Sequence, residues 1–185
     1  MKVCINPGHG GKDPGAVSKC GLRESDLALS VGLELERLLV SGGFDAVLTR
    51  TGDTYMGLSE IADFANETKA NLTLSIHFNS HANEEAEGFE VWTTPGQNNS
   101  DLWATDIYCG LAQFVKGPGR KDVSDGDVDK EARFTVPVKC KMPTVLVECG
   151  FISNPAYCAW IRTDKFWARK IALGLMAGIK RGLMR

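Results

Sequence analysis

The sequence has no apolar run near 18 residues, the length that a membrane-spanning helix requires, so no membrane insertion is predicted. It has no dense stripe of lysine and arginine, and a formal net charge of −2 argues against a nucleic-acid-binding surface. None of the cysteines shows the C-x-x-C spacing of a zinc ribbon or a thioredoxin-like site. These absences leave a globular domain of ordinary composition, with 43% hydrophobic and 24% charged residues.

The N-terminus lacks the charged and apolar regions of a signal peptide, since Met1-Lys2-Val3-Cys4 leads directly into an apolar strand. We therefore expect synthesis in the cytoplasm without a leader, with all six cysteines reduced. The 185 residues contain no internal repeat, low-complexity segment or linker. A single domain over residues 1–185, acting as a monomer, is expected.

Strand and helix patterns alternate along the chain, which is typical of an α/β domain with a mostly parallel twisted sheet flanked by helices. Within 72–78 the large apolar residues occupy the even positions, so Thr73, Ser75 and His77 face the other side. Helices are predicted to begin near residues 24, 58, 100, 155 and 164. Strands are predicted at 2–6, 44–49, 72–78, 89–93, 132–138 and 144–149.

The segment 120–131 is rich in acidic residues: Asp122, Asp125, Asp127 and Asp129. It lacks the ligand order of an EF-hand and the glutamate at the twelfth position. The pattern therefore predicts a solvated, mobile loop.

Three candidate catalytic groups follow or end predicted strands. His9 lies in the glycine-rich loop after the first strand, His77 near the end of its strand, and Glu148 at the end of another. Because the carboxyl ends of parallel strands meet at one edge of a sheet, these side chains are expected to converge there. Glu24 could join them, since it opens the helix that the loop from His9 reaches.

Two imidazoles and one carboxylate, with an open fourth position, form a catalytic zinc site. A second carboxylate is then required to move a proton. Spacing alone does not decide whether Glu24 or Glu148 binds the metal. His81 is expected in the loop after the strand, because residues 72–78 alternate as a strand and the segment from His77 to His81 does not match H-E-x-x-H.

A nucleotide-binding loop is the weaker alternative. Gly8, Gly10, Gly11 and Gly15 follow a strand, but they match neither G-x-G-x-x-G nor the P-loop, in which a serine or threonine follows the lysine.

Five segments, taken in order, resemble the zinc-dependent N-acetylmuramoyl-L-alanine amidases of the Amidase_3 family. They are 6–11 (Asn-Pro-Gly-His-Gly-Gly), Glu24 with its Leu-rich helix, 48–50 (Leu-Thr-Arg), 75–80 and 143–154. The combination covers nearly the whole chain and is far more specific than any one segment.

The resemblance implies what spacing leaves open: His9, Glu24 and His77 bind Zn²⁺, and Glu148 is the catalytic carboxylate. It also implies a substrate, the amide between N-acetylmuramic acid and L-alanine in peptidoglycan. The chain departs from the family at Ile61, where an arginine is common, and in 117–131, where the usual Arg-Gly segment is not clear. A leaderless amidase resembles a phage or prophage endolysin, which acts at the cell wall after release.

Three rival functions remain at this point. One is another zinc peptidase, which acts on the stem peptides of peptidoglycan. The second is a wall-binding module without catalysis, against which the presence of Glu148 argues. The third is a nucleotide-binding α/β domain.

Overall fold

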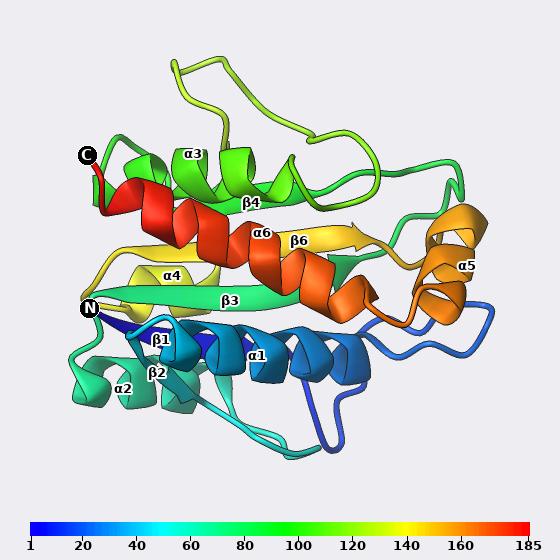
Figure 1. The fold of residues 1–185 in the computed structure, drawn as a ribbon, viewed down its shortest axis with the longest axis horizontal. Coiled ribbons are helices and arrows are strands. Elements are labelled where there is room, and N and C mark those ends of the chain that lie inside the picture. The colour runs from blue at the N-terminus through cyan, green and yellow to red at the C-terminus, as the bar shows by residue number, and fades with distance from the viewer.

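The computed structural model describes residues 1–185, which form helices on both faces of one six-stranded sheet (Figure 1). The strands are β1 (Lys2–Pro7), β2 (Asp45–Leu48), β3 (Leu72–Asn79), β4 (Glu90–Thr93), β5 (Lys130–Glu131) and β6 (Thr144–Phe151). The helices are α1 (Glu24–Ser41), α2 (Leu58–Thr68), α3 (Asn99–Leu111), α4 (Thr135–Lys139), α5 (Pro155–Thr163) and α6 (Trp167–Gly182).

The strand order across the sheet is β2-β1-β3-β6-β4-β5. The first four of these strands are parallel, whereas β4 pairs antiparallel with β6 and β5 runs parallel to β4. The carboxyl ends of β1, β3 and β6 therefore lie side by side at one edge. The prediction of a mostly parallel α/β sheet is confirmed. Both chain termini lie at the opposite edge (Figure 1).

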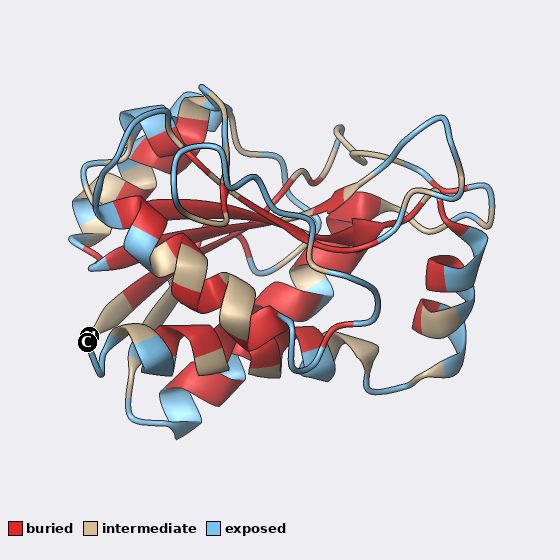
Figure 2. Cartoon of the chain, turned by 90° about the horizontal axis from the view of Figure 1, so that it is seen from above, coloured by how far each residue is buried: buried red, intermediate tan, exposed pale blue.

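One face of the sheet carries most of the hydrophobic core. Helices α1, α3 and α6 cover this face, with α6 between the other two, and they enclose a cluster of 30 buried residues (Figures 1 and 2). The predicted alternation along β3 is confirmed, because the even residues all belong to this cluster: Leu72, Leu74, Ile76 and Phe78. The odd residues of β3 are thereby presented on the opposite face.

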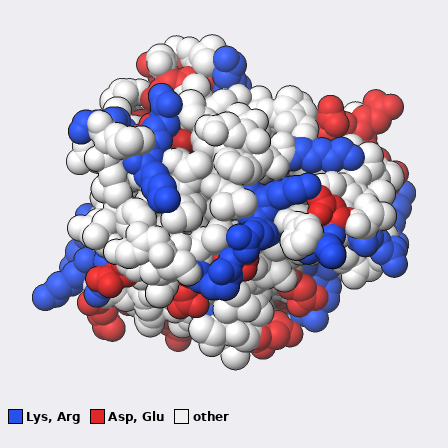
Figure 3. Space-filling model, viewed as in Figure 1, with Lys and Arg blue, Asp and Glu red and all other residues white.

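Close contact between α3 and α6 depends on glycines. A Cβ atom at Gly110 would lie 2.3 Å from the carbonyl oxygen of Gly174 and 2.4 Å from the amide nitrogen of Gly178. The two backbones therefore meet without intervening side chains. On the outer surface, charges of both signs are interspersed (Figure 3), and Arg169 of α6 pairs with Glu34 of α1 at 3.2 Å.

The second face is covered only by the shorter helices α2 and α4. The core beneath them is a small cluster of Cys4, Ala65 and Ala70. Because these helices cover less of the sheet, a pocket of about 470 Å³ opens over the carboxyl ends of β1, β3 and β6. None of the helices combines the length and the apolarity that a membrane span requires.

The predicted strand at 132–138 is wrong, because this segment contains the helix α4. Pro137 is the third residue of that helix, where its missing N–H group would have no intrahelical partner in any case. Two further boundaries also differ. Asn98, rather than Ser100, caps α3 through its side chain, and the last helix begins at Trp167.

Candidate active site

His9 lies on a tightly folded loop directly after β1. Its own φ is 61°, a left-handed conformation that is uncommon outside glycine and that clusters at functional sites. The preceding Gly8 packs against the His77 ring, and a Cβ atom there would lie 2.3 Å from Cε1 of His77. The absence of a side chain at Gly8 thus lets the loop approach β3.

Glu24 is the first residue of α1 and is 5% exposed. Its Oε2 atom accepts a hydrogen bond from the backbone N–H of Ala16 at 2.9 Å, and its Oε1 atom accepts one from the N–H of Phe78 at 3.1 Å. A carboxylate at a helix N-terminus is also favoured by the helix dipole. Its position is therefore fixed by the backbone of two other segments.

The side chains of His9, Glu24 and His77 converge on one point. Oε1 of Glu24 lies 3.1 Å from Nε2 of His9 and 2.9 Å from Nδ1 of His77. One ligand atom from each residue lies within 4.8 Å of those of the other two. The sequence predicted this convergence at the carboxyl edge of the sheet.

The protonation of these groups reflects their mutual contacts. The hydrogen bond to Glu24 raises the pKa of His9 to about 9, with a further contribution from Asp13. Burial alone would raise the pKa of Glu24, but hydrogen bonds from His77 and His9 hold it well below its usual range. Asp13 also holds Nδ1 of His9 at 2.8 Å, which leaves Nε2 directed at Glu24.

Glu148 lies on β6 directly opposite His77 of β3. Its Oε2 atom is buried and accepts no hydrogen bond, which is unusual for a carboxylate. Burial, together with the nearby charges of Glu24 and Glu90, raises the pKa of Glu148 to about 8. Glu148 is thus a carboxylate of the pocket with one oxygen that makes no hydrogen bond.

Arg50 is a structural residue of the site to which the sequence analysis assigned no role. Its buried guanidinium group donates hydrogen bonds to the carbonyl oxygens of Pro7 at 2.9 Å and of Gly8 and Ser25 at 2.8 Å each. It therefore joins the His9 loop to the first turn of α1, which carries Glu24. In the sequence, Arg50 follows the end of the second predicted strand and ends the Leu-Thr-Arg segment (48–50) of the family resemblance.

Glu90 of β4 is a second residue that the sequence analysis missed. Its Oε1 atom is held by Arg120 at 2.7 Å and by Lys130 at 2.8 Å, and it is 2% exposed. It pairs in register with Glu148. Lys130 also lies 5.2 Å above the ring of Trp92, so this network fixes β5 against β4.

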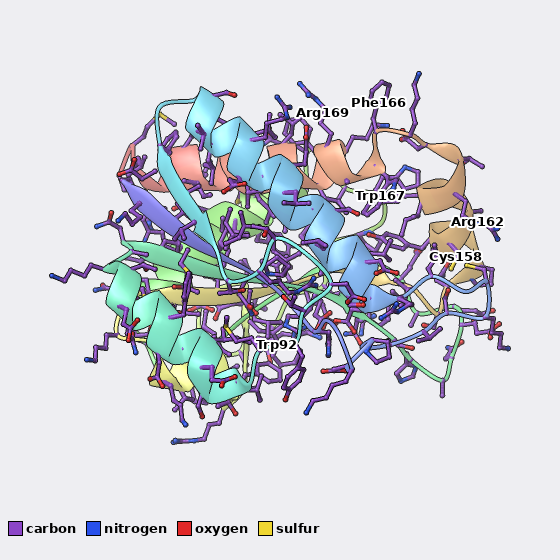
Figure 4. All side chains as sticks on the ribbon, turned by 90° about the horizontal axis from the view of Figure 1, so that it is seen from below. Trp92, Cys158, Arg162, Phe166, Trp167 and Arg169 are labelled. Carbon is purple, nitrogen blue, oxygen red and sulfur yellow. The ribbon has the colours of Figure 1, made fainter.

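Side chains from two segments form the rim of the pocket. Tyr55 precedes α2, and Arg133 and Phe134 precede α4. The ring of Phe134 meets that of Trp92 edge to face at 5.6 Å between centroids. Figure 4 shows Trp92 on the side of the sheet opposite Trp167 of α6. The rim is therefore aromatic as well as charged.

His81 lies in the loop after β3, as predicted, and its backbone N–H donates to Oγ of Ser153 at 3.0 Å. It is exposed and does not belong to the group formed by the other two histidines. Ile61, the position of a family departure, lines the pocket and is 6% exposed.

The residues present fit a zinc ion. The donor set is two imidazole nitrogens and one carboxylate oxygen, which is the composition of a catalytic zinc site with one open position. Glu148 adds a buried oxygen without a partner beside this set. The fold and the site together indicate the class of protein. An open α/β sheet with a candidate zinc site at the carboxyl ends of its parallel strands is typical of metal-dependent hydrolases.

Comparison with known proteins identifies the family within this class. A model of the family described as "N-acetylmuramoyl-L-alanine amidase" (Amidase_3) matches residues 3–181, so the chain belongs to the Amidase_3 family. A sporulation-specific N-acetylmuramoyl-L-alanine amidase of Bacillus subtilis is 33% identical over 98% of this chain and 68% of its own length.

Two solved structures share the whole fold. The N-acetylmuramoyl-L-alanine amidase from Clostridium difficile 630 has a TM-score of 0.88 at 31% identity, with 99% of this chain and 96% of that chain covered. The amidase AmiC2 of Nostoc punctiforme has a TM-score of 0.87 at 30% identity, with 100% of this chain and 98% of that chain covered. The chain is accordingly an amidase of peptidoglycan.

Proposed function

We propose that this amidase hydrolyses the bond between N-acetylmuramic acid and L-alanine with a Zn²⁺ ion held by His9, Glu24 and His77, and that Glu148 is its catalytic carboxylate. The observation that carries the proposal is the convergence of these three ligands beside a buried carboxylate oxygen that has no partner. When bound, Zn²⁺ lowers the pKa of a water molecule and polarises the substrate carbonyl group.

Glu148 moves the proton in this mechanism. Its carboxylate accepts a proton from the attacking water and delivers it to the nitrogen of L-alanine as the C–N bond breaks. A pKa of about 8 places this group close to the range in which it can both accept and release a proton near neutral pH. A cation held by the neighbouring Glu24 would lower that pKa towards neutrality.

The other residues position the reacting groups. Asp13 fixes the ring of His9, and Arg50 fixes the backbone on both sides of the site. The aromatic and charged rim, with Tyr55 and Phe134, provides the surface on which a glycan strand and its peptide lie.

The first test replaces Glu148 by glutamine, which keeps the shape of the side chain and removes its capacity to carry the proton. We expect the Glu148→Gln protein to bind one Zn²⁺ per chain, as the wild type does, and to lose at least about a hundredfold in the rate of peptidoglycan lysis. Elemental analysis and turbidity assays measure the two quantities. Equal lysis by this variant would remove Glu148 from the mechanism.

The second test identifies the bond that is cut. Digestion of purified peptidoglycan is expected to release new L-alanine N-termini, with no cleavage within the stem peptide. New N-termini from any other residue would favour the zinc peptidase alternative, and binding without any release would favour a wall-binding module.

Action as an endolysin remains a prediction. Lysis of intact cells upon external addition of the protein, compared with lysis of purified walls, is the measurement that addresses it.

A further inference from the structure

A second group of acidic side chains lies away from the active site, where β4, α3 and the segment before β5 meet. It consists of Asp101 in the first turn of α3 and of Asp127 and Asp129 directly before β5. One carboxylate oxygen from each residue lies within 4.8 Å of those of the other two. The predicted solvated loop is therefore wrong for Asp129, which is 2% exposed.

In each of these three aspartates, the Oδ1 atom has no hydrogen-bond partner. Oδ2 of Asp101 accepts from the backbone N–H of Asn98, and Oδ2 of Asp129 accepts from Oγ1 of Thr93 at 2.5 Å. The three Oδ1 atoms are buried and accept no hydrogen bond. Asp101 is itself only 4% exposed, so two of these carboxylates lie more than nine-tenths buried.

No cationic side chain neutralises the cluster. None of the ion pairs in the structure includes these residues, and Arg120 and Lys130, on the adjoining segments, are held by Glu90. Asp106, one to two turns further along α3, provides the contrast. It is 3% exposed and pairs with Arg181 at 2.8 Å and Arg185 at 3.1 Å.

Burying two carboxylates beside a third, without a counter-charge, is strongly unfavourable. The physical consequence is visible at Asp129, where burial, followed by Asp127 and Asp101, raises the pKa to about 7. Either a proton or a cation must compensate this group. A single shared proton can satisfy only part of three unpartnered oxygens, whereas a divalent cation can bind one oxygen from each carboxylate.

We propose that Asp101, Asp127 and Asp129 bind a calcium ion that fixes the segment before β5 to β4 and α3. The donors are all oxygen atoms, which suits a hard cation rather than zinc. Asp127 is only partly buried, so water can complete the coordination sphere, and Ca²⁺ accepts such an irregular set more readily than Mg²⁺.

The site has a connection to the active-site pocket. The chain leaves β5 at Glu131 and two residues later supplies Arg133 and Phe134 to the rim of the pocket. An ion at the start of this segment would therefore restrict the movement of that rim. Calcium is thus a structural ion of the pocket wall, separate from the zinc ligands.

The test is calorimetric titration of the zinc-loaded protein with CaCl₂ in metal-depleted buffer. We expect one Ca²⁺ per chain with a Kd between about 10 µM and 1 mM. At a calcium concentration a hundred times the Kd, the Tm is expected to rise by roughly 5–11 °C. Absence of binding up to 10 mM would overturn the proposal in favour of a shared proton, and an equal response to MgCl₂ would overturn the assignment to calcium.

Variants locate the site. Asp129→Asn should abolish both the binding heat and the rise in Tm, and in calcium-free buffer it should be at least as stable as the wild type, because one buried like charge is removed. Asp127→Asn, which changes the partly exposed ligand, should weaken calcium binding at least tenfold. This variant tests the site if Asp129→Asn does not fold. Asp122→Asn is the matched control, an exposed aspartate of the same loop, and should bind as the wild type does. Undiminished binding by both Asp129→Asn and Asp127→Asn would place the ion elsewhere and overturn the proposal.

Discussion

At the scale of single residues, the contacts of His9 would determine how the proposed zinc binding depends on pH. A metal ligand must be unprotonated, but the hydrogen bond to Glu24 raises the pKa of His9 to about 9. Under the proposed function, zinc binding near neutrality would therefore displace a proton from this ring. The same contact contributes stability to the metal-free protein below pH 6.5, and this contribution is lost as the pH rises through 9.

We expect the apparent zinc affinity to rise about tenfold per pH unit between pH 7 and 9 and to level off above pH 9. Calorimetry at pH 7 in two buffers of different ionisation enthalpy should show release of about one proton per zinc from His9. The His81→Gln variant is the control, because that exposed histidine lies outside the ligand group. An affinity that does not change between pH 7 and 9 would contradict the assignment.

Arg50 gives the second prediction at this scale. Lysine cannot reproduce the planar group that reaches the carbonyl oxygen of Pro7 through Nε and those of Gly8 and Ser25 through Nη2. We expect Arg50→Lys to lower zinc affinity by roughly 10–100-fold, the range typical of residues that support metal ligands. Competition with a zinc chelator measures this, and Arg37→Lys on the exposed face of α1 should leave the affinity unchanged.

The sequence allowed prediction of those site residues whose position follows from strand ends. His9 follows the end of β1, and His77 and Glu148 lie in the carboxyl-terminal halves of β3 and β6. Parallel pairing brings such residues together. Arg50 also follows a strand end, but no local pattern indicates its role. The importance of Arg50 and Glu90 comes from contacts with distant carbonyl or cationic groups.

At the scale of helices and strands, the contact between α3 and α6 depends on the space left by glycines. We expect Gly110→Ala to lower the free energy of unfolding by roughly 1–3 kcal/mol, because the new methyl group would meet the backbone of Gly174 and Gly178. The Tm should then fall by roughly 2–12 °C in differential scanning calorimetry. Gly52→Ala is the control, since a Cβ atom there meets no atom within 4 Å.

Local sequence patterns were sufficient to predict the long helices and the central strands, but they did not predict α4. The sequence Thr135-Val136-Pro137-Val138 is rich in β-branched residues, which favours a strand, yet the segment folds as a short helix over the second face of the sheet. Tertiary packing against α2 therefore overrides local propensity there. The reversal of β4 relative to β6 likewise depends on distant pairing and could not be read from the order of elements.

At the scale of the whole molecule, zinc would join three separate parts of the chain: the loop after β1, the start of α1 and the end of β3. A ligand that binds only the folded protein stabilises it according to its concentration relative to the Kd. We expect zinc at a hundred times the Kd to raise the Tm by roughly 5–11 °C. His9→Ala should lose this rise, and a rise of equal size in that variant would place the metal elsewhere.

The positions of the two termini have a consequence for how the enzyme can be tethered. Both lie at the amino edge of the sheet, whereas the pocket opens at the carboxyl edge (Figure 1). The eight residues of β3 span roughly 25 Å between these edges. A second module or a surface anchor attached to either terminus would therefore hold the domain at its amino edge. The pocket at the carboxyl edge would then face away from the attachment and towards an insoluble polymer.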